Sequence, residues 1–375
     1  MSIDIQLARI LAQPMLNDRG IKKALARGKI KIYTEISDDQ IQPGSLDARI
    51  GETYIFDNES MIAVNKEISK ITSLKKLDFD AFMKLDAYES SRDKAKFYPD
   101  KEGIPIIIPP HALAEIYFHE KISFDRIDFD LTYELRSSRG RLGLKPDSKY
   151  PKIDKSYFVE IRNANNDDII LYGQNKFANL FFNVQRRLHL DKGRVITNPK
   201  RLKKLLPEFA EKNLITSEGY VMFEVGKVAK TFKPGRVIDT AYPIDESFYD
   251  IHDLSKGYIL NKDTPAIVQL APDVSLPKNI GIMLTHRIPF HSNMQQYGFA
   301  IADYNQVNAG WVDQGYNGAL TGHPVYFMMS RLLKEGKIFS FGVVYEFNTD
   351  SDRAYGDMSL KSHYQHSTGA TTAKS

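Results

Sequence analysis

The most distinctive group of potentially reactive side chains is a polar stretch at 136–144, with the sequence RSSRGRLGL. It combines three guanidinium groups with two adjacent hydroxyls and a glycine, which lets backbone N–H groups approach a ligand closely. Guanidinium and hydroxyl groups both suit the oxygens of a phosphate chain, so the stretch predicts a phosphate-binding loop. A polar turn with solvated arginines is the alternative, and composition alone favours it.

The composition excludes several classes of site. Cysteine is absent from the 375 residues, which excludes disulfides, thiolate nucleophiles, iron–sulfur clusters and zinc sites with cysteine ligands. The net charge of +4 is too small for a protein that coats nucleic acid. No apolar run reaches the ~18 residues of a membrane span, so we expect a cytoplasmic protein with no nucleic-acid or membrane partner.

The apolar pattern predicts an all-β fold with a few short helices. Asn17 or Asp18 can cap a short helix that ends at Gly28. A second helix is predicted mid-chain, with Asn198 as its cap and Pro199 as its first residue. Elsewhere, short β-rich runs are separated by Pro, Gly, Asn and Asp, as at 104–109, 114–118, 168–172 and 178–184.

The two halves of the chain show weak similarity to each other. Residues 104–145 and 257–299 share one order of an apolar strand, a break, a second strand and a longer β-rich run. A repeat at about 155 residues is typical of a duplicated domain, although any two β domains can alternate in this way. We predict a β domain at 1–190, a helical linker at 191–217 and a second β domain at 218–375.

Three motifs occur in an order that resembles a known family. IQPGSLDARIG at 41–51 is followed by RSSRGRLGL, and then by YFVEIRN at 157–163 before a paired strand. This order resembles the dCTP deaminase branch of the dUTPase superfamily, whose motifs read QPxSxDLRLG and RSSxARLGL before a strand with a buried glutamate. The resemblance spans most of the chain and implies two dUTPase-like β-barrel or jelly-roll domains, as in the long, two-repeat members.

The resemblance implies roles for residues of the first half. Glu160 matches the catalytic glutamate, which would shuttle protons while water attacks C4 of cytosine and ammonia leaves. Ser137 matches the serine that helps to hold the water, and Arg141 the arginine that stabilises developing charge or orients the nucleophile. Arg136 and Ser138 would bind the triphosphate. For Glu160, a solvent-exposed carboxylate on an edge strand is the alternative.

The second half carries the sequence NAGWVDQGYNG at 308–318, which resembles motif three of dUTPases more than the D-P-G-W-x-G form usual in the deaminases. By this resemblance, Asp313 contacts the deoxyribose 3′-hydroxyl and helps to orient water, and Tyr316 packs under the sugar. A plain hairpin turn is the alternative. The nucleotide-binding residues predicted in this segment are Asn308, Ala309, Asp313, Gly315 and Tyr316.

Each half lacks part of the family pattern. In the first half, LKPDSKYPKIDKS replaces the D-x-G-Y segment, and in the second half His323 stands where glutamate is expected. We therefore predict one working site that combines residues of both halves, namely Ser137, Arg141 and Glu160 with Asp313 and Tyr316.

The C-terminal sequence KSHYQHSTGATTAKS resembles the family's mobile tail, which folds over bound nucleotide. Tyr364 and Gly369 match the tail and are predicted to contact the nucleotide. His363 and Ser367 stand where lysine and glutamine are usual. Plain disorder at a terminus is the alternative.

These patterns together predict a zinc-independent enzyme that hydrolyses dCTP to dUTP and ammonia, with Glu160 as general base. Zinc-dependent deaminases need cysteine ligands, and His286 and His291 lack an acidic neighbour, so no protein metal site is predicted. Mg²⁺ would arrive with the triphosphate. The alternatives are a dUTPase or bifunctional enzyme that forms dUMP and pyrophosphate, a silent nucleotide-binding protein, and a deaminase of a modified or monophosphate pyrimidine.

The expected partners are deoxycytidine or deoxyuridine triphosphate and further copies of the chain. The resemblance favours a trimer, because the family's sites lie between neighbouring β domains.

Overall fold

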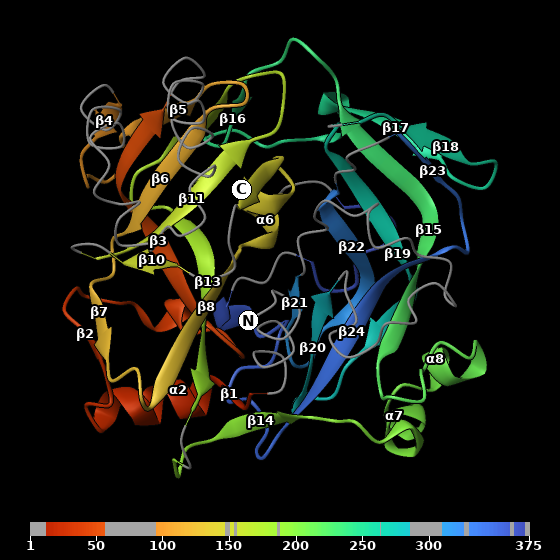
Figure 1. The fold of residues 1–375 in the computed structure, drawn as a ribbon, viewed down its shortest axis with the longest axis horizontal. Helices are drawn as coiled ribbons and strands as arrows, with labels where there is room; N and C mark the ends of the chain where they lie inside the picture. The colour runs from red at the N-terminus through yellow and green to blue at the C-terminus, as the bar shows by residue number, and fades with distance from the viewer. Residues whose placement is uncertain are drawn as a thin grey trace, which may run out of the picture.

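The computed structural model describes residues 13–56, 95–146, 151–153, 156–185, 188–262, 264–285, 310–325, 330–360 and 364–371. Within these ranges the chain is built mainly from β-strands, so the predicted all-β class with a few short helices is confirmed (Figure 1). None of the helices in the described ranges is long and apolar enough to cross a membrane. The helices are α2 (Asp18–Ala26), η1 (Asp38–Gln40), α6 (Ser137–Gly140), α7 (Pro199–Leu205), α8 (Pro207–Glu211), η2 (Glu246–Phe248) and η5 (Met358–Leu360).

The strands of the first half are β1 (Met15–Leu16), β2 (Ile30–Ile32), β3 (Leu46–Phe56), β4 (Lys96–Tyr98), β5 (Pro105–Ile108), β6 (Leu113–Phe118), β7 (Ile122–Phe124), β8 (Phe129–Leu135), β9 (Leu144–Pro146), β10 (Lys152–Ile153), β11 (Tyr157–Asn163), β12 (Ile169–Tyr172) and β13 (Lys176–Val184). The long strand β3 belongs to two antiparallel layers. Its first part pairs with β13, which pairs with β8, and its second part pairs with β6, which pairs with β11. Apolar side chains such as Ile50, Ile116 and Phe182 are buried between these layers, because alternate residues of each strand face inward.

The strands of the second half are β14 (Lys192–Val195), β15 (Val221–Phe232), β16 (Ile238–Asp239), β17 (Tyr249–Asp253), β18 (Tyr258–Leu260), β19 (Ala266–Ser275), β20 (Ile280–Thr285), β21 (Trp311–Val312), β22 (Asn317–Val325), β23 (Arg331–Leu333) and β24 (Ile338–Phe347). Strand β15 pairs with β19 and β24. These two pair in turn with β22 and β20. Phe223, Val268 and Phe341 are fully buried in the core that these strands enclose.

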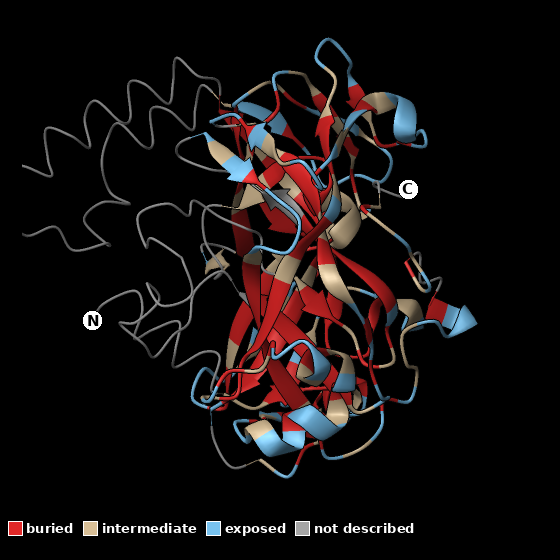
Figure 2. Cartoon of the chain, turned by 90° about the vertical axis from the view of Figure 1, so that its right-hand side faces the viewer, coloured by how far each residue is buried: buried red, intermediate tan, exposed pale blue. Residues whose placement is uncertain are grey.

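The two groups of strands lie side by side, with the first half in red to yellow and the second in green to blue (Figure 1). Strand β14 connects them, because it pairs with β1 on one side and β24 on the other. The buried residues form two clusters, drawn mainly from 16–190 and from 196–364, and they follow the strands in Figure 2. The division into two domains near residue 190 and the duplication itself stay predictions.

Both predicted helices are present, and each begins at the N-cap residue that the sequence predicts. The side chain of Asn17 accepts a hydrogen bond from the N–H of Gly20 and starts α2, and Gly28 follows the helix with a φ of 64°. Asn198 caps α7 through the N–H of Lys200, with proline in the first turn. The predicted linker at 191–217 needs one correction, because its first residues form strand β14 and only its later part is helical.

Candidate functional site

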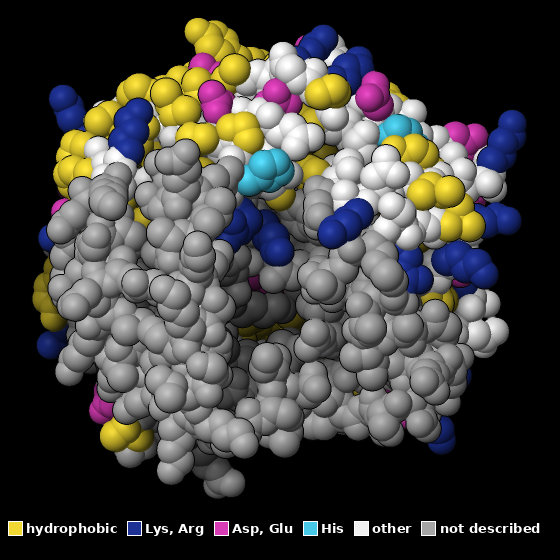
Figure 3. Space-filling view, turned by 45° about the horizontal axis from the view of Figure 1, so that its top comes forward, with side chains coloured by type: hydrophobic (Ala, Val, Ile, Leu, Met, Phe, Trp, Pro, Cys, Tyr) yellow, Lys and Arg dark blue, Asp and Glu magenta, His cyan; other side chains and the backbone are white. Residues whose placement is uncertain are grey.

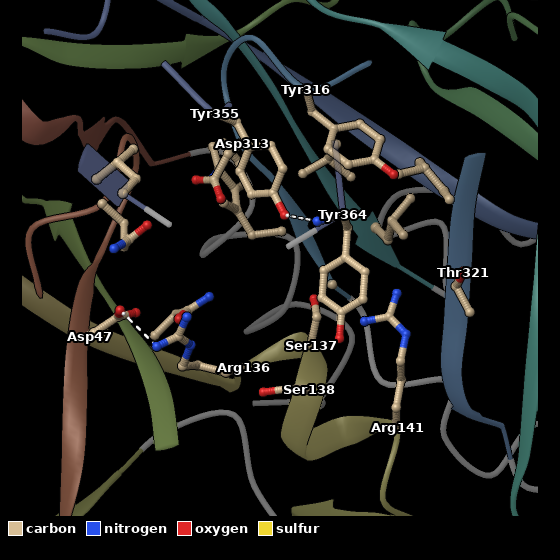
Figure 4. A pocket seen from close by; sticks show the side chains of 18 residues that line it. Asp47, Arg136, Ser137, Ser138, Arg141, Asp313, Tyr316, Thr321, Tyr355 and Tyr364 are labelled. Atoms are coloured by element: carbon tan, nitrogen blue, oxygen red, sulfur yellow. Dashed lines mark hydrogen bonds and ion pairs between the residues drawn. The ribbon is translucent and has the colours of Figure 1, made fainter. Parts of the chain in front are cut away.

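The RSSRGRLGL stretch lies where the two halves of the chain meet. Strand β8 ends at Leu135, and the N–H of Arg136 donates to the carbonyl of Phe177 on β13 at 3.0 Å. The next residues form the single turn α6, which contacts β8 and β9 of the first half and β22 of the second. The turn therefore presents its side chains to a pocket that residues of both halves line (Figure 4). On the face shown in Figure 3, several Lys and Arg side chains lie beside a hollow in the surface.

Asp47, on β3, supplies a buried negative charge at the first-half wall of the pocket. Its Oδ2 lies 3.1 Å from Nη1 of Arg136 and 3.4 Å from Nζ of Lys176. Burial raises the pKa of Asp47, and the positive charges of Arg136 and Lys176 oppose that rise. The ion pair holds the Arg136 guanidinium at the pocket wall, so this cation is in place for an anionic ligand.

Arg141 is buried on the side of α6 that faces the C-terminal segment. Its Nε donates to the carbonyl of Thr371 at 2.9 Å, and its guanidinium carbon lies 4.0 Å from the centre of the Tyr364 ring. Nη1 is buried and makes no hydrogen bond with any part of the chain that the structure describes. A buried N–H without an acceptor is unfavourable, so Nη1 is suited to donate to an oxygen of a bound ligand.

The β21–β22 hairpin of the second half forms the opposite wall of the pocket. It is hydrogen-bonded to the first half at two points, through Gln314 Nε2 to the Pro43 carbonyl at 3.1 Å and through the N–H of Trp311 to Glu134 Oε2 at 2.7 Å. Gly315 turns the chain with a φ of 83°, a conformation that glycine adopts without strain. These contacts fix the hairpin against the first-half wall.

Tyr316 joins the hairpin to the C-terminal segment. Its hydroxyl donates to the carbonyl of Ala319 at 2.6 Å and lies 3.1 Å from Oγ of Ser367. The N–H of Ala319 in turn donates to the carbonyl of Ser367 at 2.9 Å. The segment around Ser367 therefore packs along the hairpin, and Tyr364 at its start lines the pocket.

Asp313 is a half-buried carboxyl group in this wall. Its Oδ1 accepts a hydrogen bond from Nε1 of Trp311 at 3.0 Å. Burial raises the pKa of Asp313 to about 7, and the negative charge of Asp47 adds to the rise. The hydrogen bonds that Asp313 accepts from Trp311 and from the backbone N–H of Gly44 lower the pKa, as does the positive charge of Arg136. A carboxyl group that titrates near neutral pH can both accept and donate a proton.

Comparison with known proteins identifies the family. Residues 12–87 match the model of the 2'-deoxycytidine 5'-triphosphate deaminase (DCD) N-terminal domain. A protein of Methanobrevibacter smithii named "dCTP deaminase, dUMP-forming" is 30% identical over 203 residues, which are 52% of this chain and 93% of that protein. The chain belongs to the dCTP deaminase family. A protein of the same name from Methanosphaera stadtmanae is 30% identical over 174 residues, or 45% of this chain and 78% of that protein.

A solved structure shows that the likeness in fold extends over nearly the whole chain. The crystal structure of 2'-deoxycytidine 5'-triphosphate deaminase from Agrobacterium tumefaciens covers 89% of this chain and 99% of its own, with a TM-score of 0.62 and 15% sequence identity. The family resemblance inferred from the three motifs is confirmed, and the protein is an enzyme of the dCTP deaminase family.

For this dCTP deaminase family member, the structure brings most of the predicted site residues together. Seven of them line the pocket described above: Arg136, Ser137, Ser138, Arg141, Asp313, Tyr316 and Tyr364. Gly315 and Gly369 do not line it, and each instead supplies a positive φ, of 83° and 66° respectively, at a turn. Asn308, Ala309, His286, His291 and His363 lie outside the described residues, as does the side chain of His323.

Glu160 is not brought to this pocket. It lies in β11 opposite Glu115 of β6, and its carboxylate forms an ion pair with Lys152 of β10. The neighbouring residues Val159 and Ile161 point into the first-half core, so strand alternation places Glu160 on the opposite face of its sheet. The predicted grouping of Glu160 with Ser137 and Arg141 is therefore not what the structure shows for this pocket.

Eleven of the eighteen residues that line the pocket were not predicted from the sequence, and three of them, Asp47, Trp311 and Tyr355, contact predicted site residues. Asp47 stands inside the quoted SLDARIG motif, and Trp311 inside the hairpin motif, so both positions could have been singled out. Tyr355 lies in no motif, and its hydroxyl accepts a hydrogen bond from the N–H of Tyr364 at 3.2 Å.

The described residues contain no group of three or more His, Asp or Glu side chains that could hold a metal ion. The carboxyl groups at the pocket, Asp47 and Asp313, are instead engaged by Arg136 and Trp311.

Proposed function

We propose that the protein hydrolyses dCTP to dUTP and ammonia, without zinc, in the pocket between its two halves. The observation that carries this proposal is that the RSSRGRLGL turn and the Asp313 hairpin, which are far apart in the sequence, line one pocket. Membership of the dCTP deaminase family supports the reaction type.

The triphosphate would bind at the α6 side of the pocket. Arg136 offers a guanidinium already oriented by Asp47, and the hydroxyls of Ser137 and Ser138 lie beside it. These groups are suited to phosphate oxygens, and a magnesium ion would enter as part of the substrate, held mainly by phosphate oxygens and water.

Asp313 is the group that we assign to proton transfer in this pocket. Water must lose one proton as it attacks C4 of cytosine and a second when the new C4 hydroxyl becomes a carbonyl, while N3 and the departing amino group each gain one. Asp313 as a carboxylate can take the first proton from water and deliver it to N3. It can then take the second from the C4 hydroxyl and deliver it to the amino group, so that the C4–N bond breaks and ammonia leaves. Nη1 of Arg141 is available to stabilise negative charge that develops on the substrate.

Glu160 is the alternative base, as the family resemblance implies. Two variants separate the assignments. Asp313→Asn should lower ammonia release from dCTP by about 10²–10⁴-fold, the usual contribution of acid–base catalysis, while Glu160→Gln should keep most of the activity. Binding of dCTP, measured at equilibrium, should persist in both variants. Loss of turnover in Glu160→Gln alone would move the role to Glu160.

Formation of dUMP is the second candidate function. The hairpin around Asp313 resembles motif three of dUTPases, and both relatives carry the name "dUMP-forming". The test is to incubate the protein with Mg²⁺ and dCTP, and separately with dUTP, and to measure ammonia, pyrophosphate and nucleotides. Ammonia with accumulating dUTP supports deamination alone, and ammonia with dUMP and pyrophosphate supports a bifunctional enzyme. Pyrophosphate from dUTP without ammonia from dCTP would refute deamination, and binding without either product would indicate a silent nucleotide-binding protein.

The described residues that line the pocket all belong to one chain. We keep a homotrimer as the proposed assembly, on the strength of the family resemblance. Light scattering of the purified protein tests it, since a monomeric mass together with full activity would refute any requirement for assembly.

A further inference from the structure

Trp311 is held in one orientation at the pocket wall. Its indole ring lies close to two glycines: a methyl group added at Gly281 would come within 2.3 Å of Cζ2, and one added at Gly44 within 2.7 Å of Nε1. The rings of Phe181 and Tyr345 pack edge-on against it, with centroids 5.9 and 5.7 Å away. Side chains larger than glycine at 44 and 281 would displace the indole, so the surrounding chain specifies this one position.

The fixed indole connects the first half of the chain to Asp313. The backbone N–H of Trp311 donates to Glu134 Oε2 on β8 at 2.7 Å, and Nε1 donates to Asp313 Oδ1 at 3.0 Å. An indole N–H is a donor only, so it favours the charged, accepting form of the carboxyl group.

The other groups facing Asp313 act in both directions. The negative charge of Asp47 on β3 disfavours the carboxylate, whereas the positive charge of Arg136 and the N–H of Gly44 favour it. Tyr355 also lies near Asp313: burial raises the pKa of that phenol, and the charge of Asp313 adds to the rise. The hydrogen bond from Trp311 Nε1 is a contribution to the pKa of Asp313 that a single side-chain substitution can remove without changing any charge.

We propose that Trp311 is a positioning residue, which fixes the orientation of the Asp313 carboxyl group and stabilises its ionised form for proton transfer. This inference rests on the proposed acid–base role of Asp313. It extends that role to a residue with no reactive group of its own, and it assigns a purpose to Gly44 and Gly281 as the two positions that make room for the ring.

The test exploits the fact that Trp311 is the single tryptophan in the sequence. Growth of a tryptophan auxotroph on 3-benzothienylalanine therefore replaces this ring alone with one of the same shape that lacks the N–H. Trp311→Phe is the encoded counterpart, and the isosteric analogue keeps the test informative where the smaller ring destabilises the fold. Phe181→Leu is the matched control, because Phe181 packs on the same indole and does not line the pocket.

The first readout is the titration of Asp313, followed by ¹³C NMR of labelled aspartate carboxyls and assigned with Asp313→Asn. Loss of the indole donor should raise the midpoint of the Asp313 titration by about one pH unit. A hydrogen bond to a charged group stabilises it by about 1.5 kcal/mol, and about 1.36 kcal/mol corresponds to one pH unit. The control should keep the wild-type midpoint. An unchanged midpoint in both the analogue and Trp311→Phe would overturn the proposal.

The second readout is the pH profile of kcat/KM for dCTP. Its acidic limb should move upward by the same amount, so that activity below the midpoint falls about tenfold with KM little changed. A moved titration with an unmoved profile would support the contact and refute the acid–base role of Asp313. The two failures are therefore distinguishable.

Discussion

Replacing Asp313 by asparagine should change how the stability of the protein depends on pH. The pKa of this carboxyl group rises from 3.8 to about 7 on folding, mainly because of burial. The unfolded chain therefore releases the proton at a lower pH than the folded chain does, and the free energy of unfolding falls as pH rises from about 4 to 7.

The size of this loss follows from the shift. Three pH units at about 1.36 kcal/mol each give about 4 kcal/mol, and we use about 3 kcal/mol because Asp313 is only half-buried. Asparagine has no charge to desolvate, and its side-chain oxygen can still accept from Trp311 Nε1. Relative to the wild type, Asp313→Asn should therefore gain about 3 kcal/mol between pH 4 and pH 8.

Urea unfolding followed by circular dichroism at several pH values measures this difference. Asp245→Asn is the control, and its effect on the pH dependence of stability should have the opposite sign. Hydrogen bonds from Ser247 lower the pKa of Asp245, so this carboxylate stabilises the fold at neutral pH and the stabilisation is lost as pH falls. A stability difference for Asp313→Asn that is the same at pH 4 and pH 8 would refute the burial of an ionisable group at this site.

Three further substitutions test the packing and the binding groups. Gly281→Ala should lower the free energy of unfolding by about 1–3 kcal/mol, since its methyl group would lie 2.3 Å from the Trp311 ring, and thermal unfolding measures this. Asn163→Ala should cost about 2–3 kcal/mol in the same assay, because its Nδ2 donates to the buried carbonyl of Ile108 at 2.9 Å; wild-type stability would contradict that bond. Arg136→Gln should raise KM for dCTP at least about tenfold with a smaller change in kcat, and an effect on kcat alone would argue against triphosphate binding at this residue.

Local sequence determined the elements whose signals lie close together in the chain. Asn17 and Asn198 cap helices because a short polar side chain can reach an N–H only two or three residues ahead. The β-rich runs predicted strands for a similar local reason. Strand β14 was missed, since its four residues, KGRV, have little apolar character and form a strand only because β1 and β24 provide partners on either side.

The order and spelling of the motifs are properties of the chain itself, so the sequence was enough to identify the family and to predict that the RSSRGRLGL turn and the D-x-G-Y hairpin meet at one site. Which carboxyl groups share the pocket depended on how the strands pack. Glu160 follows its motif in sequence, but strand alternation and the Lys152 ion pair place it on another face. Asp47, Trp311 and Asp313 meet only where two halves of the chain pack together, and the raised pKa of Asp313 arises from that burial. Such long-range desolvation has no local signature, so the motifs could be recognised in the sequence, whereas the raised pKa of Asp313 became visible only in the fold.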